Sequence, residues 1–172
     1  MPRHIAADQV PDLYSIHQRV LAITHGDKAI RYGPVGALPD GRMVVLLRAA
    51  DGTALPGVAE AELKTLEDGM RFTVRTGVRL IKQTCHGECM PDVDEAMEKW
   101  NQALSAGGFG AENTHMRESA ISFFHRRLKR RTTLPFWAVT CTLIVVDAKM
   151  AAETMVRGVG RNRGLGFGML AA

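Results

Sequence analysis

The order in which helix and strand patterns follow one another most constrains how this chain of 172 residues folds. In the first half, apolar residues recur at helical spacing from Leu13 to Ile23 and predict a helix. Pro39-Asp40-Gly41 separates two strand patterns and predicts the turn of a β-hairpin. The expected elements therefore run strand, helix, strand, strand, helix, strand, at residues 3–7, 11–24, 29–38, 42–49, 59–66 and 71–74.

The second half of the chain repeats this order. A first strand is expected to follow a break at Gly77, Asp147 is a good N-cap for the last helix, and Gly158 is suited to end it. The order β-α-β-β-α-β is that of a ferredoxin-like unit. The sequence thus predicts an α+β fold of two tandem ferredoxin-like domains, residues 1–85 and 86–172. The expected elements of the second are residues 78–82, 93–104, 121–128, 136–146, 149–157 and 167–170.

Positive charge gathers toward the end of the chain. Residues 1–110 carry 12 Lys and Arg against 14 Asp and Glu, whereas residues 111–172 carry 10 against 4. Such a basic region favours a polyanion as partner, although a solvated surface would have the same composition. The densest basic run lies at residues 124–131, where it is expected to follow the phosphates of a nucleic acid. Its permanent cations are Arg126, Arg127, Lys129, Arg130 and Arg131.

Composition excludes several other classes of protein. No apolar run approaches the ~18 residues of a membrane span, and the first residues do not resemble a secretory signal. The three cysteines are an odd number without a disulfide spacing, so a reducing cytoplasm is the expected location. Cys85-His86-Gly87-Glu88-Cys89 lacks the paired second half of a zinc site. We therefore expect no metal, no cofactor and no membrane association.

The chain ends in GVGRNRGLGFGMLAA, in which glycines alternate with Arg161 and Arg163. Glycine lets backbone approach a ligand closely, and the planar fork of arginine suits phosphate. A dinucleotide fingerprint is excluded because Arg163 stands where its third glycine should be, and a Walker loop lacks its Gly-Lys-Ser/Thr. The sequence thus predicts a loop that binds a phosphate backbone. Its glycines are Gly158, Gly160, Gly164, Gly166 and Gly168.

This C-terminal pattern resembles the glycine-rich loop of the RAMP superfamily, the RNA-binding proteins of CRISPR systems, which are built from ferredoxin-like folds. The segment Leu143–Asp147, followed by a short helix and then the loop, is similar to the CasE-type repeat-processing endoribonuclease of Cascade complexes. The segment Trp100–Phe109 also resembles the linker helix of that family.

Tyr14 and His17 lie three residues apart on the first predicted helix and therefore share one face. Taken alone, His17 would be interpreted as a histidine at the edge of the core, because Leu13 and Leu21 flank it at four-residue spacing. The resemblance instead places both residues on the catalytic Tyr-x-x-His of the family. It implies that His17 transfers a proton, that Tyr14 orients the reacting group, and that Arg163 with Arg161 binds the phosphate.

The function implied by the resemblance is metal-independent cleavage of CRISPR repeat RNA. Its products would be a 2′,3′-cyclic phosphate and a 5′-hydroxyl, and the basic run would hold the RNA stem. The implied partners are repeat RNA and the other subunits of a Cascade-like or type IV effector complex. Two alternatives stay open: a non-catalytic RAMP-fold RNA-binding subunit, and an unrelated ferredoxin-like protein that binds a small phosphorylated ligand.

Overall fold

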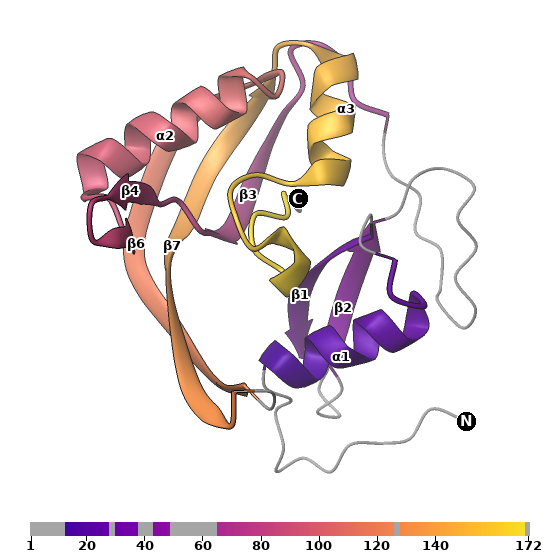
Figure 1. The fold of residues 1–172 in the computed structure, drawn as a ribbon. Coiled ribbons are helices and arrows are strands. Elements are labelled where there is room, and N and C mark those ends of the chain that lie inside the picture. The colour runs from indigo at the N-terminus through magenta and orange to yellow at the C-terminus, as the bar shows by residue number, and fades with distance from the viewer. Residues whose placement is uncertain (1–12, 28–29, 38–42, 49–64, 126–127, 171–172) are drawn as a thin grey trace.

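The protein is an α+β molecule in which the last described residues, from Gly158 to Leu170, lie between its two halves (Figure 1). The computed structural model describes residues 13–27, 30–37, 43–48, 65–125 and 128–170. Its first elements are α1 (Leu13–Ile23), β1 (Arg31–Ala37), β2 (Met43–Arg48), β3 (Arg71–Val78), β4 (Lys82–Thr84) and β5 (Gly87–Cys89). These are followed by α2 (Val93–Ser105), β6 (Phe109–His125), β7 (Arg130–Val145), α3 (Ala148–Arg157) and the short 3₁₀ helix η1 (Arg163–Leu165).

The largest layer is an antiparallel sheet of three strands in the order β3-β7-β6. Alternate residues of the central strand β7 are buried, as expected for a strand with one face against a core. Helices α2 and α3 both contribute to that core, through Trp100 and Ala151 respectively. The buried residues of β7 are Trp137, Val139, Cys141, Leu143 and Val145.

A smaller unit is formed by α1 and the antiparallel hairpin β1-β2. Its buried apolar cluster consists of Ile16, Val20 and Tyr32. The buried Arg48 at the end of β2 connects this unit to the rest of the protein, because its Nη1 donates to the carbonyl oxygen of Met155 in α3 at 2.7 Å. The two halves of the described chain are therefore in direct contact.

An aromatic cluster joins three parts of the chain that are distant in sequence. Phe123 and Phe136 come from the long hairpin of β6 and β7, Phe167 from the C-terminal segment, and Tyr14 from α1. The Phe136 and Phe167 ring centroids are 5.3 Å apart. Because aromatic side chains bury large areas, this cluster fixes α1, the hairpin and the loop relative to one another.

The fold class expected from sequence is confirmed, and so are most of its helices. Helix α2 differs by one residue from its expected bounds, and α3 begins where the Asp147 side chain accepts a hydrogen bond from the Met150 backbone N–H at 2.8 Å. The first hairpin is also found. The expected strand 3–7 and turn 39–41 lie outside the described residues. Residues 59–64 of the expected helix 59–66 lie outside them too. The tandem arrangement and the boundary after residue 85 stay predictions.

Three strand predictions were wrong. The expected strand 78–82 does not form, because β3 ends at Val78 and β4 begins only at Lys82. No break occurs at Gly77, since β3 runs from Arg71 to Val78 without interruption; a side chain at Gly77 would meet the Phe136 ring at 3.1 Å. Residues 167–170 form turns and extended chain rather than a strand, although the Gly168 N–H donates to the Gly77 carbonyl at 2.7 Å. The C-terminal segment thus lies beside β3 with only isolated pairing. Among the described residues, no helix is long and apolar enough to span a bilayer.

Candidate active site

The glycine-rich loop turns back on itself immediately after α3. Gly158 ends the helix with φ +69°, and the Gly168 carbonyl accepts a hydrogen bond from the Val159 N–H at 2.8 Å. Gly168 has φ +71°, and a Cβ there would lie 1.6 Å from the Val159 carbonyl oxygen, so that only glycine fits. Gly164 differs from both, because a Cβ would meet nothing within 4 Å. The glycines of the loop therefore close its backbone at some positions and leave it open at others.

Arg161 extends from this loop toward the β4-β5 hairpin. Its backbone N–H donates to the Arg79 carbonyl at 3.0 Å, which attaches the loop to the end of β3. Its side chain is 62% exposed and forms an ion pair with Glu88, with 2.5 Å between Nη1 and Oε1. Without RNA, the Arg161 guanidinium that was predicted to bind phosphate is thus paired with the Glu88 carboxylate.

Arg163 is bound to backbone instead. Its Nη1 donates to the carbonyl oxygens of Arg157 at 3.3 Å and Gly158 at 3.2 Å. These are carbonyls at the C-terminal end of α3, where positive charge is favoured by the helix dipole. Arg163 therefore stabilises the turn from helix to loop while its side chain also lines the cavity described next.

His17 and the glycine-rich loop line the same cavity, which has a volume of about 560 Å³. Both predicted loop arginines, Arg161 and Arg163, line this cavity together with His17, as do Tyr32 of β1 and Asn162 between the arginines. The cavity therefore brings residues from the two ends of the sequence together. Figure 1 shows the loop between α3 and the unit of α1, β1 and β2.

The environment of His17 favours its neutral form. Partial burial lowers the pKa of the imidazole below 6.5, and a backbone hydrogen bond with Gly164 partly offsets this effect. The ring stacks on Tyr32 with 6.2 Å between centroids. Its Nδ1 is buried without a hydrogen-bond partner among the described residues. A neutral imidazole with an unoccupied nitrogen can accept a proton near neutral pH.

Tyr14 lies one helical turn away, beside the β6-β7 hairpin. Its ring stacks on Phe123 at 6.4 Å and lies 5.4 Å from the His125 ring. Unlike His17, Tyr14 is not among the residues that line the cavity. It connects α1 with the end of the hairpin.

The basic run lies at that end of the hairpin. Lys129, Arg130 and Arg131 are exposed, and the Leu128 N–H donates to His125 Nδ1 at 3.3 Å to close the turn. Arg126 and Arg127 lie outside the described residues. Because the Tyr14 ring lies beside the His125 ring, this end of the hairpin lies next to α1.

Sequence reasoning missed three neighbours of this site. Tyr32 stacks on His17 but reads in the sequence only as one apolar position of a strand. Asn162 accepts a hydrogen bond from Arg79 Nη1 at 2.5 Å and adopts φ +57°. The asparagine between the two arginines was a signal for such a turn, because this residue type tolerates a positive φ. Glu88 gave no signal, since only the fold brings it to Arg161.

The fold is similar to those of solved CRISPR proteins. The CRISPR endoribonuclease Cse3 bound to 19 nt RNA gives a TM-score of 0.71 at 19% identity, covering 99% of this chain and 95% of that chain. The CRISPR-associated protein Cas6e from Escherichia coli str. K-12 gives 0.67 at 18% identity, with coverages of 93% and 91%. A chain of a CRISPR RNA-guided surveillance complex, pre-nicking, gives 0.62 at 12% identity, with coverages of 95% and 90%.

Sequence comparison gives the family. No curated protein sequence is detectably similar to this chain. The family described as "CRISPR associated protein" matches residues 68–171, which include β3, the whole β6-β7 hairpin and the glycine-rich loop. This match spans more than half of the chain and contains the loop on which the resemblance was based. The chain therefore belongs to the CRISPR-associated protein family.

Proposed function

We propose that this protein is a metal-independent endoribonuclease that cuts CRISPR repeat RNA into guide units. The observation that carries the proposal is the shared cavity, which His17 lines together with the loop that contains Arg161 and Arg163. A histidine that shares a cavity with two guanidinium groups supplies both needs of RNA cleavage, proton transfer and stabilisation of phosphate charge. The fold shared with Cse3, which is bound to RNA in its structure, adds independent support.

In the proposed reaction, the 2′-hydroxyl of the RNA attacks the adjacent phosphorus. A bond forms between the 2′-oxygen and phosphorus, and the bond from phosphorus to the 5′-oxygen breaks. The 2′-hydroxyl loses a proton and the 5′-oxygen gains one, which leaves a 2′,3′-cyclic phosphate and a 5′-hydroxyl. His17 transfers a proton in this step, and its lowered pKa suits the role of base at neutral pH.

The other residues of the proposed site hold the RNA. Arg161 exchanges its exposed partner Glu88 for a phosphate, and Arg163 exchanges its carbonyl contacts for the oxygens of the scissile phosphate. Tyr14 orients the reacting group indirectly, because its packing in the aromatic cluster fixes the position of α1. Of the loop glycines Gly158, Gly160, Gly164, Gly166 and Gly168, Gly164 has open surroundings that let RNA approach the backbone, whereas Gly158 and Gly168 hold the turn of the loop.

The basic end of the hairpin is proposed to bind the RNA stem. Its cations Arg126, Arg127, Lys129, Arg130 and Arg131 would contact phosphates, which position a duplex without reading its sequence. The proposed protein partners are other subunits of a CRISPR effector complex in the cytoplasm. The similarity to a chain of a CRISPR RNA-guided surveillance complex supports such an assembly.

The test is an RNA cleavage assay with the repeat RNA of the same CRISPR locus. In EDTA, the wild type should cut at one position and leave a 2′,3′-cyclic phosphate. His17→Ala should reduce the rate by about 10²–10⁴-fold, the usual contribution of a general acid or base. A 2′-deoxy nucleotide at the cut should abolish cleavage while binding persists. An unchanged rate in His17→Ala, or cutting at the 2′-deoxy nucleotide, would refute the mechanism.

The position of Tyr14 favours one second candidate, a non-catalytic RNA-binding subunit of the same complexes. Tyr14 packs in the aromatic cluster rather than lining the cavity, so the helix can serve a purely structural role. For this candidate, the wild type would bind the repeat RNA with salt-dependent affinity and never cut it. Absence of RNA binding would instead favour a protein that takes a small phosphorylated ligand.

A further inference from the structure

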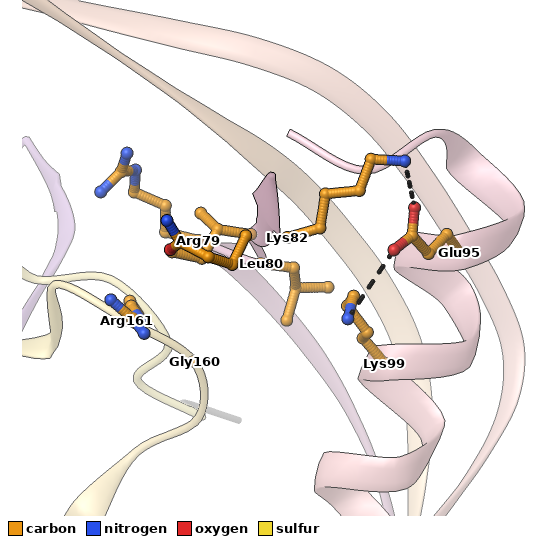
Figure 2. Close-up of a pocket in the computed structure, with 9 residues that line it drawn as sticks. Arg79, Leu80, Lys82, Glu95, Lys99, Gly160 and Arg161 are labelled. Atoms are coloured by element: carbon orange, nitrogen blue, oxygen red, sulfur yellow. Dashed lines mark hydrogen bonds and ion pairs between the residues drawn. The ribbon is translucent and has the colours of Figure 1, made fainter. Parts of the chain in front are cut away.

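A second cavity, of about 530 Å³, lies on the side of Arg161 that faces β4 and α2 (Figure 2). Figure 2 shows the glycine-rich loop on one side of it and α2 on the other. Four cationic side chains and one carboxylate line it, which makes it a basic cavity. The residues relevant here are Arg79, Lys82, Glu95, Lys99, Gly160 and Arg161.

Two lysines of this cavity share one carboxylate. Lys82 Nζ lies 2.7 Å from Glu95 Oε2, and Lys99 Nζ lies 3.8 Å from Glu95 Oε1. The side chains of Lys82 and Lys99 remain 38% and 36% exposed, so each can donate further hydrogen bonds outward. One carboxylate leaves the two ammonium groups with a net positive charge that is available to an anion.

The wall between the two cavities is fixed. Gly160 and Arg161 line both of them, and the Arg161 N–H bonds to the Arg79 carbonyl. Arg79 Nη1 also donates to Asn162 Oδ1 at 2.5 Å. A chain of phosphates that leaves the His17 cavity therefore reaches the second cavity by passing Arg161, without another element in between.

We propose that this second cavity binds the phosphates of the single-stranded RNA that continues from the bond cut beside His17. This inference rests on the proposed function. The basic lining matches successive phosphates, and the shared residues Gly160 and Arg161 favour a continuous strand over an acidic segment of another protein. Lysine contacts of this kind bind a strand through its charge and do not read its bases.

The test compares two RNAs, both with a 2′-deoxy nucleotide at the cut. One is the repeat hairpin alone, and the other is the same hairpin with single-stranded flanks. The double variant Lys82→Ala with Lys99→Ala should bind the flanked RNA about tenfold more weakly, and its salt slope should fall by about 0.7 for each lost single-strand contact. Its affinity for the hairpin alone should stay unchanged. Lys149→Ala, an exposed lysine on α3, is the matched control.

Glu95→Gln tests the same cavity in the opposite direction. Removing the carboxylate frees both lysines, so the flanked RNA should bind more tightly and the hairpin alone should not. Unfolding curves of each variant exclude a folding defect as the cause of any loss.

The outcomes distinguish this inference from the proposed function. An equal effect of the lysine changes on both RNAs, or no effect on either, overturns the second site while wild-type cleavage leaves the proposed function intact. If the lysine variant binds RNA normally but no longer binds another subunit of the complex, the cavity belongs to a protein partner. That outcome also overturns the inference. If the wild type neither binds nor cuts repeat RNA, the proposed function itself fails.

Discussion

The two walls of the His17 cavity are anchored very differently. The wall that contains His17 belongs to α1, β1 and β2, whose described apolar cluster has three buried residues. The opposite wall, the glycine-rich loop, is continuous with a cluster of fifteen, to which the loop contributes Val159 and Leu170. Because local stability follows buried apolar contacts, the loop wall should be the more rigid of the two. The proposed phosphate-binding groups thus lie on the firm wall and the proposed proton-transfer group on the weaker one.

The largest expected effect contrasts the two clusters. Trp100→Ala in the large cluster should lower the free energy of unfolding by about 3–5 kcal/mol, and Ile16→Ala in the small one by about 2 kcal/mol, near the low end for such changes. Trp100 is fully buried, whereas Ile16 is 8% exposed. Chemical denaturation measures both values. Equal losses would show that the two walls are equally anchored.

The next effect concerns the loop wall itself. Gly168→Ala should distort the turn, because its Cβ would overlap the Val159 carbonyl oxygen and the backbone has φ +71°. We expect RNA affinity to fall about tenfold or more, as strain of ~1–3 kcal/mol is typical of such positions. Gly110→Ala in β6 is the matched control, since its Cβ would make only ordinary contacts, the nearest at 3.8 Å. Titration with labelled repeat RNA measures both; similar affinities of the two variants would contradict the role of the turn.

A smaller effect concerns the histidine wall and pH. Burial lowers the pKa of His17 below 6.5, so the imidazole stays neutral to a lower pH than a free histidine does. If His17 is the base, kcat/KM should fall with decreasing pH through a midpoint below 6.5, where the imidazole becomes protonated. His86→Ala, on the exposed turn between β4 and β5, should leave this profile unchanged. A rate that falls as pH rises through the same range would assign the acid role.

The smallest effect concerns the partner of Arg161. Glu88→Gln removes the carboxylate that competes with phosphate, and exposed ion pairs contribute about 0–1 kcal/mol. RNA should therefore bind up to about fivefold more tightly at low salt. Glu112→Gln breaks a similarly exposed pair with Arg71 in the sheet and serves as control. Equal or weaker binding by Glu88→Gln would show that Glu88 does not compete with RNA.

Local signals explain which parts of the fold were predictable. Helix α3 was found because Asp147 and Gly158 are strong boundary residues, and their hydrogen bonds lie within the same few residues. Strand β6 begins at Phe109, twelve residues before its expected start. The first part of the strand was not predicted, because the polar segment up to Ala120 lacks the apolar runs of a buried strand. Its pairing with β7, rather than its own composition, makes it a strand.

The candidate site was predictable only in part. The resemblance identified His17 and the loop arginines, which the structure brings to one cavity. Tyr32 and Glu88 were missed, since an ordinary strand residue and an ordinary turn residue become neighbours of the site only after folding. Nothing local in the sequence indicated that Arg163 would bond to the end of α3.

The sequence by itself determined the α+β class, the helix boundaries, the basic hairpin end and the chemical types of the site residues. These follow from spacing, capping and side-chain chemistry within short segments. Only the tertiary structure decided that the Arg161 guanidinium is already paired, that Arg163 closes a helix, and that a second basic cavity adjoins the first. The physical reason is that ion pairs and cavities depend on which distant segments pack together, and here the glycine-rich end packs between both halves of the chain.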